Sequence, residues 1–428
     1  MVCRNIAYQF LLNLPTINIL LPIVLPTLYL WVVDTLALRR GTWVIESGTK
    51  LGWHFWEGLD IEEALFFLVT NILIVFGLVA FDNAVAIIDA FPDIFPEHHC
   101  LPSPALLIKA LLLTPQAFDE ERILGMRQAF QRLKSKSRSF YLASGTFQRR
   151  LRIDLILLYA FCRVADDLVD EATNPKQAKD WITKLVKYLD LEYNIEINKN
   201  SKGLHDYVQS HFPVATHAIL RHLPTNHLHP SPLYDLLKGF EMDLEFASGK
   251  GPFPIQDERI LELYSARVAG TVAESCLALV YHHCTDIKSK AQKLEIQSRG
   301  RLMGIALQYI NIARDIAIDA ANSRVYLPTA WLKEASLDPN DVLRSPDRSE
   351  IENFRQRLIA KAMEMYRDAR DAIEDLPSEA RAPMRVAVES YVEIGRVLQE
   401  PGYRVKAGRA TVSTSRRLRV AWQAIRCG

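Results

Sequence analysis

The chain carries Arg163-Val-Ala-Asp166-Asp-Leu-Val-Asp170 and, much later, Gln308-Tyr-Ile-Asn311-Ile-Ala-Arg-Asp315-Ile-Ala-Ile-Asp319. Each stretch places carboxylates four residues apart, and on a helix side chains four apart lie one turn above another on the same face. Oxygen ligands of this kind are what Mg²⁺ prefers, and substrate phosphates and waters usually complete its octahedron. Two such faces turned toward each other therefore predict a magnesium site.

The residues between these carboxylates extend the same two stripes. The stripes comprise Tyr159, Arg163, Asp166 and Asp170 on the first helix and Gln308, Asn311, Asp315 and Asp319 on the second. Arg163 and Arg314 are placed to grip a diphosphate that the metals bridge. A single D-x-x-x-D arises by chance about once or twice in a chain this rich in acids, so for one patch alone a solvent-facing acidic stripe is the favoured interpretation. The two patches together favour a metal site instead. Both lie in strongly apolar helices, where an unpaired buried carboxylate is costly, so a cation must neutralise them.

Composition narrows the class of protein. The 428 residues carry a formal net charge of +1, which argues against nucleic acid as the main partner. No C-x-x-C spacing for zinc or redox work occurs among the six cysteines, which are Cys3, Cys100, Cys162, Cys276, Cys284 and Cys427. These cysteines indicate reduced, structural thiols and a chain that faces the cytosol.

The amino-terminal region has the apolar runs of a membrane protein. Residues Ile17–Val33 and Ala64–Phe81 contain few polar side chains, and a span needs ~20 largely apolar residues. A weaker apolar stretch, Ala84–Ile88, gives a doubtful third span. Arg39 and Arg40 between the two runs predict a cytosolic loop by the positive-inside rule. We expect a multi-pass membrane region; the alternative is a buried core hairpin of a soluble domain.

Prolines mark a domain boundary after this region. They stand at positions 92, 96, 102, 104 and 115, a spacing that no long helix tolerates. We therefore expect a first region over residues 1–95, a proline-rich linker over 96–116 and a second domain over 117–428. His98 and His99 lie in the linker and are interpreted as surface residues, because no carboxylate or thiol stands at ligand spacing.

Beyond residue 116 the pattern is helical almost throughout. Apolar residues recur at three- and four-residue spacing in Ile153–Val169, Leu233–Phe246, Ile260–Val280, Met303–Ile318, Ile351–Ile373 and Met384–Leu398. This pattern predicts an all-α domain, because strand-like alternation is absent. Within it the polar segment Pro175–Lys202 is interpreted as a solvated helix and loop.

Six ordered motifs stand in the chain from about Ser135 onward: Ser137-Arg-Ser139-Phe140-Tyr-Leu-Ala-Ser, Tyr159-Ala-Phe-Cys-Arg163 with the first acidic stretch, Gly239-Phe-Glu-Met242-Asp243-Leu244, Tyr264-Ser-Ala-Arg-Val-Ala-Gly270-Thr-Val272, the second acidic stretch, and Arg324-Val-Tyr326-Leu-Pro328. In these motifs the chain resembles the squalene and phytoene synthase family, the head-to-head prenyl synthases. The resemblance implies an all-α isoprenoid-synthase fold with a central cavity. It also implies three Mg²⁺, with Mn²⁺ as an alternative, over two prenyl diphosphates.

The resemblance assigns roles residue by residue. The implied metal ligands are Asp166, Asp170, Asn311, Asp315 and Asp319. The positions near the diphosphates are Ser137, Ser139, Arg163, Gln308, Arg314 and Tyr326, and those of the cavity wall are Phe140, Tyr159, Tyr264 and Val272. The catalytic candidates are the four aspartates together with Arg163 and Tyr264. Ala273 stands where many relatives have glycine, a small departure that removes no ligand.

The implied reaction joins two molecules of geranylgeranyl diphosphate to phytoene through a cyclopropyl intermediate. An apolar cavity keeps water from the cations, and aromatic faces stabilise them. No glycine-rich nucleotide loop is visible, so we expect no nicotinamide cofactor. Two alternatives remain: a squalene synthase, which would need NADPH, and a catalytically silent membrane-anchored assembly factor, which would be expected to lose metal ligands. The sequence gives no oligomeric state.

The amino-terminal region contains Trp31-Val-Val-Asp34-Thr-Leu-Ala-Leu-Arg-Arg-Gly-Thr-Trp43 and Leu59-Asp60-Ile-Glu62-Glu63-Ala-Leu-Phe66-Phe67-Leu-Val-Thr-Asn71. In these two stretches it resembles the membrane lycopene cyclase domain that fungi fuse to phytoene synthase. Cyclisation of a carotenoid needs an acid at a double bond, and Glu62 and Glu63 at a membrane boundary are the candidates; the alternative is that they are interfacial charges that end a span. Such domains have two similar halves, of which about the last half precedes the proline-rich boundary. With this resemblance, the synthase domain is expected to face the cytosol.

Overall fold

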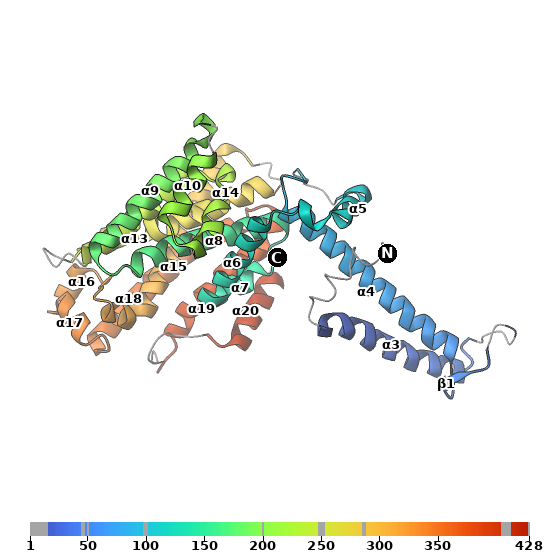
Figure 1. Cartoon of the computed structure of the whole chain (residues 1–428). Coiled ribbons are helices and arrows are strands. Elements are labelled where there is room, and N and C mark those ends of the chain that lie inside the picture. The colour runs from blue at the N-terminus through green and yellow to red at the C-terminus, as the bar shows by residue number, and fades with distance from the viewer. Residues whose placement is uncertain are drawn as a thin grey trace. The chain divides into compact units, whose positions relative to one another are not determined.

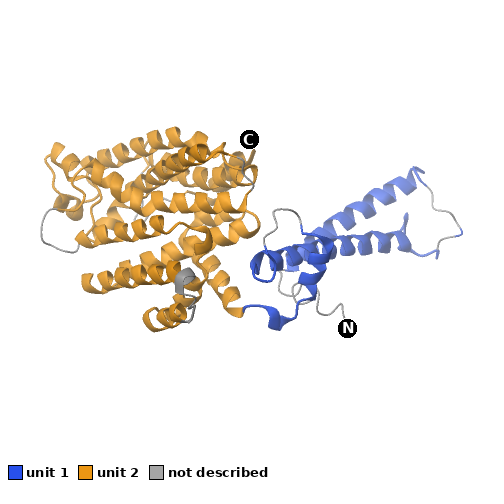
Figure 2. Cartoon of the chain, turned by 90° about the horizontal axis from the view of Figure 1, so that it is seen from above, with its two compact units in different colours: residues 1–119 blue, residues 120–428 orange. Residues whose placement is uncertain are grey.

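The computed structural model describes residues 16–43, 48, 51–96, 102–198, 201–246, 253–284, 288–403 and 412–426. The chain divides into two compact units, residues 1–119 and 120–428 (Figure 2). Helices dominate both units, which confirms the predicted all-α class, and the described residues add one short two-stranded ribbon in the first unit. The paired histidines 98 and 99 lie outside the described residues.

Unit 1 is built on two long apolar helices, α3 (Thr16–Arg39) and α4 (Ile61–Ala90) (Figure 1). The antiparallel strands β1 (His54–Trp56) and β2 (Leu59–Asp60) lie between them in the chain. Both helices are long and apolar enough to cross a membrane, and few of their side chains are buried within the unit. A third segment of that length and composition, Glu258–His283, is half buried in unit 2 and belongs to its core.

The weaker apolar stretch Ala84–Ile88 continues α4, so the described residues give it no helix of its own. It packs with Phe95 and Ala110 in a small core. Ala110 belongs to α5 (Pro104–Leu112), and the segment expected to be a linker therefore contains a packed helix of unit 1. That helix forms despite the prolines because Ser103 caps its N-terminus and a proline is tolerated in the first helical turn.

Unit 2 is a layered bundle of helices (Figure 1). Its longer elements are α6 (Glu120–Lys136), α7 (Arg138–Ser144), α8 (Arg149–Asp170), α9 (Pro175–Asn198), α10 (Ser201–His211), α11 (Val214–Arg221), α12 (Pro230–Phe246), α13 (Glu258–Ser265), α14 (Thr271–His283), α15 (Lys290–Ala321), α18 (Ser349–Arg370), α19 (Ser378–Leu398) and α20 (Thr414–Arg426). The short helices α16 (Thr329–Glu334) and α17 (Pro339–Arg344) join α15 to α18.

Helix α9 corrects the interpretation of residues 175–202 as solvated. Ile182, Leu185 and Leu189 on this helix are buried in the main core. They recur at three- and four-residue spacing, so one apolar face packs against α8 and α12 while the charged residues cover the other. The high share of charge hid this narrow apolar stripe.

Helix α15 lies at the centre of unit 2, where it contacts α14, α18, α19 and the π-helical turn η4 (Ala266–Gly270). The contact with η4 is backbone to backbone at Gly304. A Cβ added to Gly304 would stand 2.6 Å from the carbonyl oxygen of Ala269 and 2.8 Å from the Cα of Gly270. Gln308 follows one turn later on α15, so this close approach sets the position of the second acidic stripe.

Replacing Gly304 by alanine should lower the Tm of the chain, because the new methyl group meets rigid backbone and overpacking of this kind costs about 1–3 kcal/mol. Gly300→Ala on the same helix is the matched control, since its methyl group meets only the flexible side chain of Leu277. Thermal unfolding followed by tryptophan fluorescence measures both variants. Equal losses of Tm would contradict the proposed role of the close approach.

Candidate active site

The first acidic stripe occupies the last two turns of α8. Arg163 reaches along the helix to Asp166 at 2.9 Å and to Asp167 at 2.8 Å. Asp167 also pairs with Arg132 of α6 at 2.5 Å, so it ties α8 to α6. The stripe itself therefore consists of Asp166 and Asp170, with Arg163 as the cation beside it.

The second acidic stripe lies in the last third of α15. Arg314 holds Asp315 through two hydrogen bonds, of 2.9 Å from Nε and 2.5 Å from Nη2. The Asn311 Nδ2 donates to the Gln308 side-chain oxygen at 3.0 Å, and the Asn311 Oδ1 accepts from the Tyr391 hydroxyl. The amide oxygen of Asn311, the atom that a metal would bind, is thus oriented by its neighbours.

A buried aspartate on α12, Asp243, lies beside the two stripes. It is 8% exposed and accepts hydrogen bonds from the hydroxyls of Tyr326, at 2.7 Å, and Tyr264, at 3.2 Å. The two tyrosine rings stack with centroids 5.0 Å apart. Arg324 donates to Asp170 at 2.7 Å, which connects the loop after α15 to α8. Asp243 and Arg324 belong to the motifs at 239–244 and 324–328, but the sequence alone predicted no role for either residue.

The pKa values of the acids indicate that both stripes face one space. Burial, with the nearby Asp170 charge next in size, raises the pKa of Asp166 to about 7. Burial and then the Asp315 charge raise the pKa of Asp319 to about 8. Asp243 contributes to both shifts, which requires it to lie near α8 and α15 together. Its own pKa rises to about 6, chiefly through burial and against the Arg324 charge.

This charge distribution fits a divalent cation by its donor chemistry. Carboxylate and amide oxygens crowd one space, and their mutual repulsion is relieved when cations enter it. Within the described residues, no three histidine, cysteine, aspartate or glutamate side chains converge closely enough to hold one metal ion by themselves. The carboxylates instead hold Arg163, Arg314 and Arg324, so phosphate oxygens and waters would have to supply the remaining ligands.

Aromatic side chains line the neighbouring wall. Phe140 stacks on Tyr391 with ring centroids 5.0 Å apart and meets Tyr159 edge to face at 6.2 Å. Burial raises the pKa of Tyr159 to about 12, so its phenol stays neutral. Val272, in the first turn of α14, packs against the main core. Tyr391 lies outside every motif that the sequence analysis used, and no local signal singled it out.

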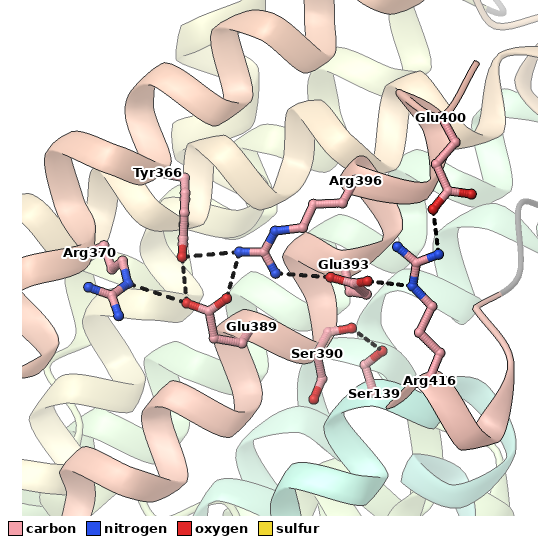
Figure 3. Close-up of polar contacts among 9 residues, drawn as sticks. All are labelled: Ser139, Tyr366, Arg370, Glu389, Ser390, Glu393, Arg396, Glu400 and Arg416. Atoms are coloured by element: carbon pink, nitrogen blue, oxygen red, sulfur yellow. Dashed lines mark hydrogen bonds and ion pairs between the residues drawn. The ribbon is translucent and has the colours of Figure 1, made fainter. Parts of the chain in front are cut away.

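The two serines of the first motif, which were predicted to lie near the diphosphates, form hydrogen bonds with main-chain atoms in this structure. Ser137 caps α7 by accepting from the Phe140 N–H at 3.3 Å. Ser139 donates to the carbonyl oxygen of Ser390 at 3.2 Å, which ties α7 to α19 (Figure 3). Helix α19 is held from its other side by a charged network whose members are Tyr366, Arg370, Glu389, Glu393, Arg396, Glu400 and Arg416 (Figure 3). This bracing fixes the helix that carries Tyr391.

A basic group on the last helix also faces this region. Arg417 of α20 is 9% exposed, and its Nε finds no partner among the described residues. Burial and the neighbouring charges of Arg138 and Arg314 lower its pKa. Three guanidinium groups brought together in this way suit an anion that carries several negative charges.

The two glutamates assigned to cyclisation belong to unit 1, whereas the residues described above belong to unit 2. Glu62 and Glu63 stand in the first turn of α4, and Glu62 accepts a hydrogen bond from the Leu51 N–H. Negative charge at a helix N-terminus is favourable in itself, so their position also fits a structural role.

Comparison with known proteins agrees with the two motif sets. The family model of squalene/phytoene synthase matches residues 133–416. A bifunctional lycopene cyclase/phytoene synthase of Leptosphaeria maculans is 56% identical, over 98% of this chain and 72% of that protein. Proteins with the same name from Phaeosphaeria nodorum and Neurospora crassa are 55% and 48% identical, over 98% of this chain and 71% and 73% of theirs.

Solved structures support the fold of unit 2. A dehydrosqualene synthase in complex with ligand is 21% identical, with a TM-score of 0.55 over 71% of this chain and 96% of that one. The squalene synthase HpnC from Alicyclobacillus acidocaldarius is 19% identical, with a TM-score of 0.51 over 67% of this chain and 96% of that one. At these identities the likeness speaks for the isoprenoid-synthase fold alone.

The raised pKa of Asp243 predicts a pH-dependent stability. Because the folded state keeps this proton up to about pH 6 and the unfolded state loses it near pH 4, Asp243 makes the fold less stable as the pH rises through that window. As the pH rises from 4.5 to 7, the Tm of Asp243→Asn should therefore increase relative to that of the parent chain. The corresponding change in the free energy of unfolding is at most about 3 kcal/mol. Asp206→Asn, at an exposed position, should show no such gain. A constant difference across this pH range would contradict the assignment.

Proposed function

The chain belongs to the squalene/phytoene synthase family, and from this premise we propose that residues 117–428 condense two molecules of geranylgeranyl diphosphate to phytoene. The observation that carries the proposal is the meeting of two acidic stripes with Asp243 and three arginines around one space. The names of the relatives favour phytoene over squalene as the product. No nicotinamide is required, because the last step is loss of a proton.

The first chemical task is to release a diphosphate. Mg²⁺, held by Asp166, Asp170, Asn311, Asp315 and Asp319, would neutralise the leaving diphosphate when bound. Arg163, Arg314 and Arg324 already lie at these carboxylates and would turn to the phosphate oxygens as cations take their place. Gln308 keeps the Asn311 amide oriented during this exchange.

The second task is to guide the cation that forms. The allylic cation of one molecule is attacked by the double bond of the other, which gives the cyclopropyl intermediate and then, after a second ionisation and rearrangement, phytoene. Phe140 and Tyr159 present ring faces that stabilise such cations, and Val272 belongs to the apolar wall that excludes water. The hydrogen bonds of Asp243 hold Tyr264 and Tyr326 in stacked positions beside the diphosphate site.

Asp315→Ala should lower phytoene formation at least about 100-fold, because it removes a ligand position and the anchor of Arg314. The assay is phytoene content in bacteria that accumulate geranylgeranyl diphosphate. Asp206→Ala, an exposed change on α10, is the control and should leave phytoene within about twofold of the parent chain. Near-normal phytoene with Asp315→Ala would refute the role of the stripes, and absence of phytoene from the parent chain would refute the synthase function.

Residues 1–95 are assigned to a lycopene β-cyclase region, in which Glu62 or Glu63 takes part in proton transfer. The support is the motif resemblance together with relatives named for both activities. Ring closure is an isomerisation: a proton adds at a terminal double bond of lycopene and another leaves the ring. Expression of the chain in bacteria that accumulate lycopene tests this assignment, and unchanged lycopene would refute it.

Membrane topology follows from the two apolar helices. α3 and α4 are proposed to cross the bilayer as a hairpin, with the synthase domain in the cytosol, where the free thiols of Cys162, Cys276 and Cys284 fit a reducing compartment. Two spans return the chain to the side where it started, so the loop after Arg39 lies on the opposite side. A cytosolic loop and a cytosolic synthase domain would need a third span between them. Residues 84–88 continue α4 instead, so the proposed hairpin does not keep the cytosolic position expected for that loop.

A cysteine introduced at Leu51, an exposed position in the loop, should therefore react with a membrane-impermeant maleimide in intact bacteria. Ser349→Cys, exposed on unit 2, is the matched control and should react only after lysis. The reverse pattern would place the synthase domain outside the cytosol.

A further inference from the structure

The loop end of the α3–α4 pair brings several distant residues of unit 1 together. The Trp31 indole N–H on α3 donates to the carbonyl oxygen of Ala64 at 3.0 Å. The Trp56 indole N–H on β1 donates to the Thr35 hydroxyl at 2.9 Å. Residues 31–35 of α3 therefore contact the first turn of α4 at Ala64 and strand β1 at Trp56.

An aromatic cluster occupies the same place. The ring of Trp31 lies 4.9 Å from that of Phe55 and 5.7 Å from that of Trp56, and the last two are 5.3 Å apart. Phe55 is 52% exposed, so a hydrocarbon can reach the cluster from outside the unit. Ring faces attract cations, which is the property that a cyclisation through carbocations requires.

Asp34 is the acid that this arrangement leaves available. Its side chain is buried, with the residue 3% exposed, and its Oδ1 accepts from the Trp43 indole N–H at 3.1 Å. Its Oδ2 is also buried but has no hydrogen-bond partner among the described residues. A buried carboxyl oxygen without a partner is costly and rare in folded proteins, and such atoms call for a functional explanation.

Neighbouring acids are placed differently. Asp60 is equally buried but pairs with the His54 ring nitrogen at 2.7 Å, which occupies it in the ribbon. Glu62 also has a buried Oε2 without a partner in the part of the chain that the structure describes, but it stands in the first turn of α4, where the helix N-terminus stabilises a negative charge. That position suits a group that receives a proton better than one that delivers it.

We propose that Asp34 is the catalytic acid of the cyclase region and that Glu62 is its proton acceptor. The inference rests on the proposed lycopene cyclase function. The Asp34 O–H bond breaks as a C–H bond forms at the terminal double bond of lycopene. The resulting tertiary cation, beside the rings of Trp31 and Phe55, is attacked by the next double bond to close the ring. A proton then leaves the ring to Glu62, so no oxidant or reductant is consumed.

Asp34→Asn tests the proposal in the full chain, expressed in bacteria that accumulate lycopene. Loss of the acidic proton should lower the yield of cyclised carotenoid at least about 100-fold. Phytoene formation, measured in the geranylgeranyl diphosphate strain, should stay within about twofold, and immunoblotting of membranes confirms equal protein. Asp82→Asn, exposed on α4, is the matched control and should leave both activities unchanged.

Asp34→Glu separates chemistry from packing. Asparagine has the size of aspartate without its acid, whereas glutamate keeps the acid and disturbs the buried site more. A catalytic acid therefore predicts at least tenfold more cyclisation with Asp34→Glu than with Asp34→Asn. The opposite order, or Asp34→Asn within threefold of the parent chain, would overturn the role of Asp34 alone. Failure of the parent chain to cyclise lycopene would overturn the cyclase assignment and this inference together.

Discussion

Crowding of like charges in a poorly solvated space is the constraint on which unit 2 depends. Burial raises the pKa values of Asp166 on α8, Asp243 on α12 and Asp319 on α15, and the Asp243 charge adds to the shifts of the other two, so the fold holds together groups that repel. Arg163, Arg314 and Arg324 balance part of this charge in the structure. A site that is short of positive charge binds cations together with their diphosphates, and the arginines are then free to hold the phosphate oxygens.

Much of the bundle serves to keep these groups in place. The backbone contact at Gly304 fixes the position of α15 against η4. Two contacts fix the position of α19: the hydrogen bond from Ser139 and, separately, the charged network around Glu389 and Glu393. Unit 1 also buries a carboxyl group. Asp34 is buried, one of its oxygens has no partner among the described residues, and the other accepts from the Trp43 indole. One unit is thus suited to releasing an anion, and the other to delivering a proton.

The sequence predicted the parts of this account that lie within one helix. Four-residue spacing placed Asp166 with Asp170 and Asp315 with Asp319 on single faces, and length with hydropathy predicted α3 and α4. Partners supplied by distant segments were missed. Tyr391 reaches Asn311 across 80 positions of sequence, and Arg324 reaches Asp170 across 154, which no periodicity reveals. The apolar face of α9 was missed because charged residues dominate that segment. Helix α5 was missed because its prolines were interpreted as helix breakers, although a proline in the first turn does not end a helix.

The central claim is that both acidic stripes hold one cluster of metal and diphosphate, and locating bound metal ions tests it most directly. Crystals grown with Mn²⁺ and the unreactive thiodiphosphate analogue of geranylgeranyl diphosphate would reveal the metals by anomalous scattering. The account predicts Mn²⁺ between Asp170 and Asp315, with Arg324 turned from Asp170 to the phosphate oxygens. Diphosphate bound elsewhere, with the Arg324–Asp170 pair intact and no metal between the stripes, would contradict it.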